Sequence, residues 1–352
     1  MNDFRKIDQE IIKASKQIKP LYHIEPVNLV DQKLKFLSGK IENPLFKYRE
    51  LEYRPSDIVE KLVSLNIPRD EIGRLYKKKI NEILKKNEIV LNRDNFGRVK
   101  KLTISLYGRP NRELIAKAKK LLENTPSTIE EKVVDSNKMM SAIRNAIKDI
   151  GLKGWRTEFS EKNITTVSPA ERKITLGKNR KFSRLDLKRL PVHEVGVHMT
   201  RAANGYTQPY KIFAIGLPGY LSTEEGLAVY FEKKLGFQSN EVLRDFAGRV
   251  LAVNSLDRGL DFRTTYDSLV KYNLPEDQAW TLCVRVFRAG GFLKDHVYLK
   301  GYFEIDDFVK SGGDLIKLYV GKVGLQHLPE VEKLMGSDKI LSPKFIPSFL
   351  NK

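Results

Sequence analysis

The hexapeptide HEVGVH at positions 193–198 constrains the fold of this chain more than any other part of its sequence. Its histidines are five residues apart, whereas the metal-binding pattern H-E-x-x-H places them four apart, one helical turn from each other. At 3.6 residues per turn, a five-residue step turns the second imidazole about 140° away from the first. A π-bulge closes a turn in five residues and brings the imidazoles back together. Gly196 weakens the helix and Pro191 removes a helical N–H, so we predict a bulged or kinked helix here.

A metal site built on these histidines needs a third protein ligand and an open position for water. Glu225 offers that ligand from the sequence TEEGLA, which has the composition of a helix start. Glu224 and Glu225 are about 100° apart around a helix, so only one of them should face the ion. We therefore predict that Zn²⁺ is the cofactor and that His193, His198 and Glu225 hold it. Glu194 is the expected general base, which takes a proton from a water whose pKa the zinc lowers to about 7.

The periodicity of apolar residues predicts a mostly helical chain with a small sheet. Helices are expected over residues 7–18, 70–84, 111–123, 135–150, 183–203 and 222–235, and strands over residues 102–106, 155–159, 163–167 and 172–176. Residues 204–222 begin with Asn-Gly and are rich in Gly and Pro, which predicts a loop. This mixture predicts an α+β fold. We expect a basic helical N-terminal region over 1–97 and a catalytic domain over 98–352.

The charge balance is the unusual feature of the composition. The chain has 63 Lys and Arg against 44 Asp and Glu, which gives a net charge of +19. Such a charge attracts acidic partners, although solvated helix faces are the simpler alternative for its lysine runs. No zinc-finger, basic-zipper or RNA-recognition pattern accompanies the charge, so nucleic acid is not an expected partner.

Cysteine content and hydropathy indicate the cellular compartment in which the protein is expected. The single cysteine, Cys283, excludes a disulfide framework within the chain and any site with several thiolate ligands. No apolar run reaches the roughly 18 residues needed to cross a bilayer, and the first ten residues lack the apolar core of a secretory signal. We therefore expect a cytoplasmic protein that does not enter a membrane.

Several short segments resemble the microtubule-associated tyrosine carboxypeptidase family, whose bacterial relatives are called flavohemoglobin expression-modulating QEGLA-motif proteins. They are HEVGVH at 193–198, Asn204-Gly205, Gln208-Pro209, EEGLA at 224–228, LYGRP at 106–110, and Lys294-Asp295 with Tyr298 and Gly301. The resemblance covers roughly residues 100–305 and implies a zincin-like, gluzincin-type metallopeptidase fold with a small sheet beside the metal-binding helix. It assigns zinc to His193, His198 and Glu225, and catalysis to Glu194. Glu224 departs from the family's Gln and changes the charge beside the ligand.

The resemblance also implies a substrate, because the family's eukaryotic members remove the C-terminal tyrosine of tubulin. The expected activity is that of a zinc carboxypeptidase acting on the C-terminus of a peptide or of an acidic protein tail. A carboxypeptidase holds the terminal carboxylate with a cation, for which Arg288, Lys294 and Arg201 are candidates. Tyr298 is a candidate donor to the oxyanion. An ordinary ion-pair or packing role stays open for each of these four residues.

Two alternatives to a carboxypeptidase stay open on the sequence alone. The first is a regulatory protein that is non-catalytic or acts indirectly and uses a structural zinc site to bind an acidic partner. Glu194 favours an enzyme over this reading, because a structural metal site does not need a general base. The second is a dipeptidyl or endo-acting peptidase with the same zinc site. Dipeptidyl peptidase III enzymes also use H-E-x-x-x-H with a downstream glutamate, which supports the chemistry of the stretched motif.

Overall fold

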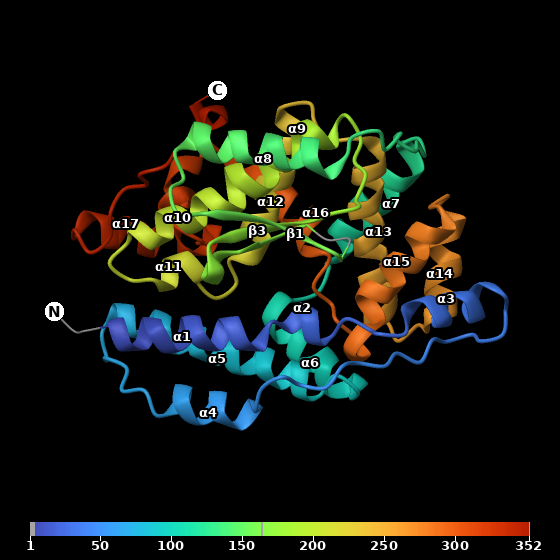
Figure 1. The fold of residues 1–352 in the computed structure, drawn as a ribbon, viewed down its shortest axis with the longest axis horizontal. Coiled ribbons are helices and arrows are strands. Elements are labelled where there is room, and N and C mark those ends of the chain that lie inside the picture. Colours follow the sequence, from blue (N-terminus) through green and yellow to red (C-terminus); the bar gives the residue numbers. More distant parts are fainter. Residues whose placement is uncertain (1–3, 163–164, 352) are drawn as a thin grey trace. The chain divides into compact units, whose positions relative to one another are not determined.

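The computed structural model describes residues 4–162 and 165–351 of the chain (Figure 1). Its contacts divide the chain into two compact units, each built from segments that are far apart in sequence. Unit 1 comprises residues 1–12, 129–239 and 301–352, and unit 2 comprises residues 13–128 and 240–300. The boundary falls within α1 (Arg5–Ile18) and within α16 (Val297–Lys310). The expected division into a basic region over 1–97 and a catalytic domain over 98–352 concerns function, and it stays a prediction.

Unit 1 contains the sheet and the helices around it. Its remaining elements are α8 (Ser136–Ile150), β1 (Arg156–Ser160), β2 (Thr165–Ser168), η1 (Pro169–Glu171), β3 (Lys173–Gly177), α9 (Asp186–Leu190), η2 (Pro191–Met199), α10 (Thr200–Thr207), α11 (Ile212–Ile215), α12 (Leu221–Lys234), η4 (Leu315–Val320), η5 (Leu325–His327), α17 (Leu328–Gly336) and η6 (Ser348–Asn351). Strand β3 lies between β1, to which it is parallel, and β2, to which it is antiparallel. The three strands confirm the predictions over 155–176, except that residues 163–164 fall outside the described part of the chain.

The core of unit 1 joins the sheet to the helix that carries HEVGVH. Strand β3 directs Ile174 and Leu176 inward, as the two-residue period of a strand requires, and both are fully buried. They share one apolar cluster with Ile143 of α8 and with Val195 and Met199 of η2. Helix α8 therefore packs along both β3 and η2 (Figure 1). The mostly helical α+β architecture, with a small sheet next to the two histidines, is confirmed.

Within the described residues of unit 2, the regular elements are all helices. Its remaining elements are α2 (Pro20–His23), α3 (Leu29–Leu37), α4 (Pro55–Val63), α5 (Glu71–Leu91), α6 (Phe96–Tyr107), α7 (Arg112–Asn124), α13 (Asn240–Asp257), α14 (Phe262–Lys271), α15 (Glu276–Phe287) and η3 (Arg288–Gly290). An aromatic cluster of Phe36, Phe262 and Trp280 joins α3, α14 and α15, with ring centroids 5.1–5.2 Å apart. In the part of the chain that the structure describes, no helix is both long enough and apolar enough to span a bilayer.

The strand predicted over residues 102–106 is wrong, because this segment belongs to helix α6. Asn95 caps the helix by accepting a hydrogen bond from Arg98 N at 3.1 Å. Val99, Leu102 and Thr103 are buried at helical spacing, so the apparent alternation of apolar and hydroxyl residues does not mark two faces. The Thr103 hydroxyl donates back to the Lys100 carbonyl at 3.1 Å, which is how a threonine is accommodated within a helix.

The loop predicted over residues 204–222 is only partly correct, because α10 extends to Thr207 and α11 lies within the segment. Asn204 is fully buried, and its amide oxygen accepts from Lys344 N at 3.0 Å and from Phe345 N at 2.8 Å. Gly205 packs so closely on α11 that an added Cβ would lie 2.3 Å from the Phe213 carbonyl oxygen. The Asn-Gly pair thus serves tertiary packing rather than a turn.

Candidate metal centre

The segment Pro191–Met199 that carries HEVGVH is a π-helix, which confirms the distortion predicted from the five-residue spacing. The wider turn brings the rings of His193 and His198 to 4.7 Å between centroids, at an angle of 85°. Glu225 of α12 reaches both rings: its Oε2 lies 3.7 Å from His193 Nε2 and 3.6 Å from His198 Nε2. Two ligands about 2.1 Å from a tetrahedral ion lie roughly 3.4 Å apart, so this spacing suits one ion.

Two glycines allow the helices of the site to pack closely. A Cβ on Gly196 would lie 2.6 Å from the Phe349 ring, so the glycine in the π-helix makes room for this side chain. In α12, a Cβ on Gly226 would lie 2.2 Å from the carbonyl carbon of Gly301 in α16. Gly226 therefore lets α12 approach the α16 backbone and fixes the position of the neighbouring Glu225.

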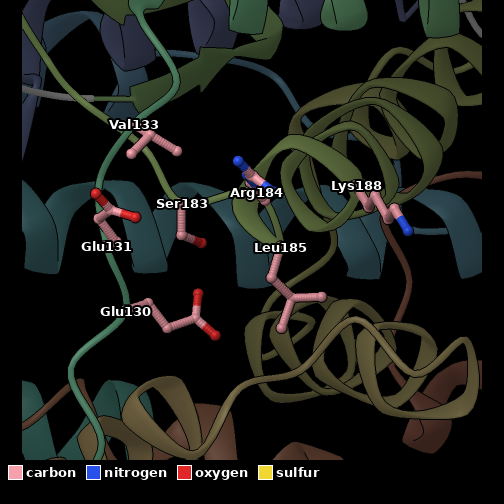
Figure 2. Close-up of a pocket in the computed structure, with 7 residues that line it drawn as sticks. All are labelled: Glu130, Glu131, Val133, Ser183, Arg184, Leu185 and Lys188. Carbon is pink, nitrogen blue, oxygen red and sulfur yellow. The ribbon is translucent and has the colours of Figure 1, made fainter.

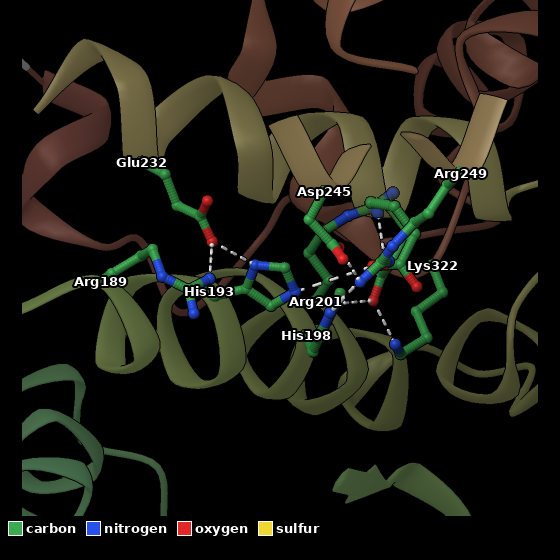
Figure 3. Close-up of polar contacts among 10 residues, drawn as sticks. Arg189, His193, His198, Arg201, Glu232, Asp245, Arg249 and Lys322 are labelled. Carbon is green, nitrogen blue, oxygen red and sulfur yellow. Dashed lines mark hydrogen bonds and ion pairs between the residues drawn. The ribbon is translucent and has the colours of Figure 1, made fainter. Parts of the chain in front are cut away.

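A buried glutamate holds the first histidine. Glu232 Oε1 lies 2.6 Å from His193 Nδ1 and also accepts from Arg189 at 2.9 Å (Figure 3). Because a carboxylate only accepts, Nδ1 carries a proton, and Nε2 is the ring nitrogen that faces Glu225. Burial raises the pKa of Glu232, but Arg189 and His193 outweigh this and lower it. Glu232 therefore stays ionised inside the protein.

The second histidine has an equivalent partner. Glu224 Oε1 lies 2.9 Å from His198 Nδ1, and the same carboxylate accepts from Lys322 and from Arg201. Figure 3 shows Lys322 and Arg201 beside His198. Burial favours the neutral acid, yet Lys322 and Arg201 lower the pKa of Glu224 to about 2. The residue that departs from the QEGLA pattern is thus an ionised carboxylate enclosed by two cations.

These contacts change the expected role of Arg201. Its side chain has no exposed surface, and it donates to Glu224 and to the carbonyls of Leu318 and Val323. A substrate carboxylate would have to displace these partners to reach it. The geometry therefore places Arg201 as internal support for Glu224 and not as the substrate-binding cation that the sequence predicted.

The donor set suits a divalent metal ion. Two imidazole nitrogens and one carboxylate oxygen lie within 4.8 Å of one another, and all three residues are buried. Burial lowers the pKa of His193, but Glu232 and Glu225 outweigh burial and raise the pKa to about 10. Burial acts in the same sense on His198, and Glu224 and Glu225 raise its pKa. Such strong carboxylate surroundings favour a positive charge at this point, which a bound Zn²⁺ would supply.

Glu194 adjoins this donor set. Only 8% of the residue is exposed, and its charge contributes to the raised pKa of His193. Among the residues that the structure describes, no group hydrogen-bonds or ion-pairs with its carboxylate. An acceptor of this kind next to the ligands suits a general base.

The other predicted substrate residues belong to unit 2. Lys294 Nζ lies 5.8 Å from the centroid of the Tyr298 ring, which also stacks on Phe246. Within the described chain, the Arg288 guanidinium has no hydrogen-bond partner, and burial together with Arg285 lowers its pKa to about 10. The structure thus brings together His193, Glu194, His198 and Glu225 in unit 1, and Arg288, Lys294 and Tyr298 belong to unit 2.

A pocket of about 370 Å³ in unit 1 contains none of the predicted site residues (Figure 2). It is lined by Glu130, Glu131, Val133, Ser183, Arg184, Leu185 and Lys188. Its lining mixes acidic and basic side chains, so no single ligand charge is favoured there.

Sequence reasoning missed the residues that support the ligands. Glu232 lies seven residues after Glu225, which is close to two helical turns, so a helical projection of α12 could have found it. Lys322 lies about a hundred residues from Glu224, and nothing in the local sequence connects them.

Three comparisons relate the chain to known proteins. A sequence model of the family described as "Microtubule-associated tyrosine carboxypeptidase" matches residues 35–352. Microtubule-associated tyrosine carboxypeptidase 1 of Rattus norvegicus is 28% identical over 165 residues, which are 44% of this chain and 35% of that protein. The chain therefore matches about a third of that relative's length. A solved structure from Colwellia psychrerythraea, described as a lipoprotein, is similar over 82% of this chain and 60% of its own, with 11% identity and a TM-score of 0.41.

Proposed function

The chain belongs to the microtubule-associated tyrosine carboxypeptidase family, and on that premise we propose that it is a zinc-dependent metallocarboxypeptidase. Its substrate is the free C-terminus of a peptide or of an acidic protein tail, from which it removes one residue. The observation that carries this proposal is the convergence of His193 Nε2, His198 Nε2 and Glu225 Oε2 beside Glu194. The fold is accordingly a zincin-like one, of the gluzincin type.

The mechanism follows from the positions of these side chains. When bound, Zn²⁺ acts as a Lewis acid and makes water more acidic. Glu194 accepts a proton from the attacking water and passes it to the nitrogen of the leaving amino acid. Glu232 and Glu224 fix the tautomer and the orientation of the two imidazoles. The buried surroundings strengthen each of these electrostatic contacts.

We further propose that Arg288 binds the terminal carboxylate, with Lys294 adding positive charge and Tyr298 donating a hydrogen bond. A guanidinium without a hydrogen-bond partner among the described residues is free to form a bidentate pair with a carboxylate. The overall charge of +19 fits a substrate with an acidic tail.

The first test incubates the zinc-loaded full chain with peptides that carry a free C-terminus, some ending in Tyr or Phe after acidic residues. Mass spectrometry should show the loss of one C-terminal residue. Glu194→Gln should abolish cleavage while zinc stays bound, whereas Glu161→Gln at an exposed position should behave as wild type. Loss of two residues or internal cleavage would indicate a dipeptidyl or endo-acting peptidase. Bound zinc without any cleavage would favour the regulatory protein.

The second test addresses the carboxylate. Arg288→Ala should raise KM for peptides with a free C-terminus at least tenfold, and amidation of the C-terminus should have the same effect on wild type. Arg258→Ala removes an exposed arginine from the same unit and serves as the control. If Arg288→Ala leaves KM unchanged, another cation binds the carboxylate.

A further inference from the structure

We infer that residues 315–323, which belong to none of the recognised motifs, form a brace that fixes the spacing and orientation of the metal ligands through Tyr319 and Lys322. The inference deepens the proposed function, since it rests on a metal ion binding to His193, His198 and Glu225. It assigns Tyr319 and Lys322 as positioning residues, because neither contacts the ligand atoms directly.

The brace contacts the π-helix at its centre. The Tyr319 hydroxyl donates to the carbonyl of Gly196 at 3.2 Å, midway between the two histidines. The Thr200 hydroxyl donates to the adjacent carbonyl of Val195 at 2.7 Å. Tyr319 is fully buried, and burial raises its pKa, so the hydroxyl stays protonated and can donate. A π-turn is rare, and these two hydroxyls hold consecutive carbonyls in the wide turn that the five-residue spacing needs.

Arg201 fastens the brace to the same helical run. Its Nε donates to the Leu318 carbonyl at 2.9 Å, and its guanidinium also bonds the Val323 carbonyl. These two carbonyls flank Tyr319 and Lys322 in the sequence. Arg201, a buried residue of α10, therefore fixes the positions of Tyr319 and Lys322 relative to that helix.

Lys322 acts on the second histidine through Glu224. Its ammonium group bonds the same Oε1 atom of Glu224 that contacts His198 Nδ1. Lys322 is only 4% exposed, so water does not replace it as a partner for the carboxylate. Without Lys322, Arg201 would be the remaining cation bonded to the Glu224 carboxylate, which would then be free to turn away from His198.

The departure from the family's QEGLA pattern gives this contact a specific meaning. A glutamine at position 224 accepts through its amide oxygen and brings no charge into the core. A glutamate at this position brings a charge that Arg201 and Lys322 both balance, but only Lys322 bonds the oxygen that contacts His198. Loss of Lys322 therefore leaves that oxygen without its cation, whereas the amide oxygen of a glutamine does not need one.

Metal affinity tests the contact with the π-helix. The full chain is stripped of metal, and its affinities for Zn²⁺ and Co²⁺ are measured by competition with a chelator. Tyr319→Phe should weaken both affinities by roughly tenfold, the lower end of the cost of losing a hydrogen-bond partner of a metal ligand, because Tyr319 acts through the backbone of Gly196. Tyr206→Phe removes a hydroxyl that donates to the Pro169 carbonyl at 2.9 Å in the same unit, and it should leave both affinities unchanged. The Co²⁺ absorption spectrum, which reports ligand geometry, should change only in Tyr319→Phe.

The charge contact is tested by rescue. Lys322→Met should weaken Zn²⁺ binding by a similar factor, and Lys322→Met with Glu224→Gln should restore it to within about threefold of wild type. Lys211→Met is the matched control, because its ammonium bonds the Tyr206 carbonyl at 3.0 Å, away from the ligands. Thermal unfolding of the metal-free variants shows whether each remains folded.

The outcomes separate the brace from the proposed function. If wild type binds neither metal, the proposed function fails. If wild type binds and both Tyr319→Phe and Lys322→Met bind equally well, the brace is overturned while the metal centre stands. A loss in Lys322→Met that the second substitution does not restore would show that Lys322 acts on overall stability and not through Glu224.

Discussion

At the scale of single residues, the two imidazoles share one arrangement. Each Nδ1 faces a buried glutamate, and each Nε2 faces Glu225. Each of these glutamates is in turn paired with cations: Arg189 bonds Glu232, and the buried Lys322 and Arg201 bond Glu224. The orientation of both rings is therefore set by the protein itself, which lowers the cost of gathering the ligands around an ion.

The raised pKa of His193 predicts how metal affinity depends on pH. Burial opposes protonation, but Glu232 and Glu225 raise the pKa to about 10, so His193 is protonated at neutral pH before a metal binds. A bound metal requires the neutral ring, so binding releases this proton, and affinity increases as the pH rises toward that pKa. We expect about a tenfold gain in Zn²⁺ affinity per pH unit for each proton released, measured by chelator competition from about pH 6 to about pH 8. A Zn²⁺ affinity that does not change with pH would mean that His193 is already neutral in the metal-free protein.

The grouping of His193, His198 and Glu225 was predictable because the histidine spacing carries a geometric requirement. Two histidines five residues apart can share an ion only in a distorted helix, and the π-helix over η2 meets that requirement. The residues that support these side chains were harder to predict. Glu232 lies on the same face of α12 as Glu225, whereas Lys322 and Tyr319 reach the site through tertiary folding alone.

At the scale of elements, short-range patterns succeeded where one face of an element is buried and failed where packing overrides them. The strand β3 and the helix α8 follow their apolar periodicity. Helix α6 does not, because its alternation of apolar and hydroxyl residues imitates a strand while its cap and its buried face are helical. The Asn204-Gly205 pair imitates a turn for a similar reason, since both residues are required by contacts with distant segments.

The crossing of α12 and α16 predicts a severe effect for Gly226→Ala. The new Cβ would lie 2.2 Å from the Gly301 carbonyl carbon, and a backbone cannot yield as a side chain does. Overpacking of this kind costs about 1–3 kcal/mol or more of unfolding free energy, and it should also displace Glu225 and weaken Zn²⁺ binding. Thermal unfolding and metal affinity would be measured together.

Gly97→Ala is the matched control for this prediction. Gly97 lies in α6, where the atom nearest to an added Cβ would be 4.0 Å away. The substitution should therefore stabilise the protein slightly. Unchanged stability of Gly226→Ala would show that α16 can move away from α12 at no cost.

At the scale of the whole molecule, each unit is assembled from separate stretches of sequence. Unit 1 draws on three stretches and unit 2 on two. Local periodicity carries no information about which stretches join, so it predicted individual elements but not this division. The amino-acid composition cannot reveal a boundary within α1 and α16, because both helices are continuous across it.

The buried Glu82 of unit 2 predicts how the free energy of unfolding changes at low pH. Burial raises the pKa of Glu82, but Lys79 and Lys86 outweigh this and lower it to about 2. Because this value lies below the unfolded one of about 4.3, the stabilisation is complete above pH 4.3 and is lost as the pH falls toward 2. The loss amounts to about 3 kcal/mol of unfolding free energy.

Urea unfolding at a series of pH values measures this dependence. Glu82→Gln should be less stable than wild type at neutral pH, and its unfolding free energy should fall less between neutral pH and pH 3. Glu60→Gln changes an exposed glutamate of the same unit and should follow the wild-type curve. Parallel curves for Glu82→Gln and wild type would show that other groups govern the acid transition.

The position of the brace in the chain also has a consequence for biosynthesis. The ribosome makes residues 193–225 first and adds Tyr319 and Lys322 about a hundred residues later. At typical elongation rates this interval lasts roughly 5 to 20 seconds. During that time a nascent chain displays both histidines and Glu225 without the side chains that hold them in register. The proposed metal centre would thus be complete only late in translation.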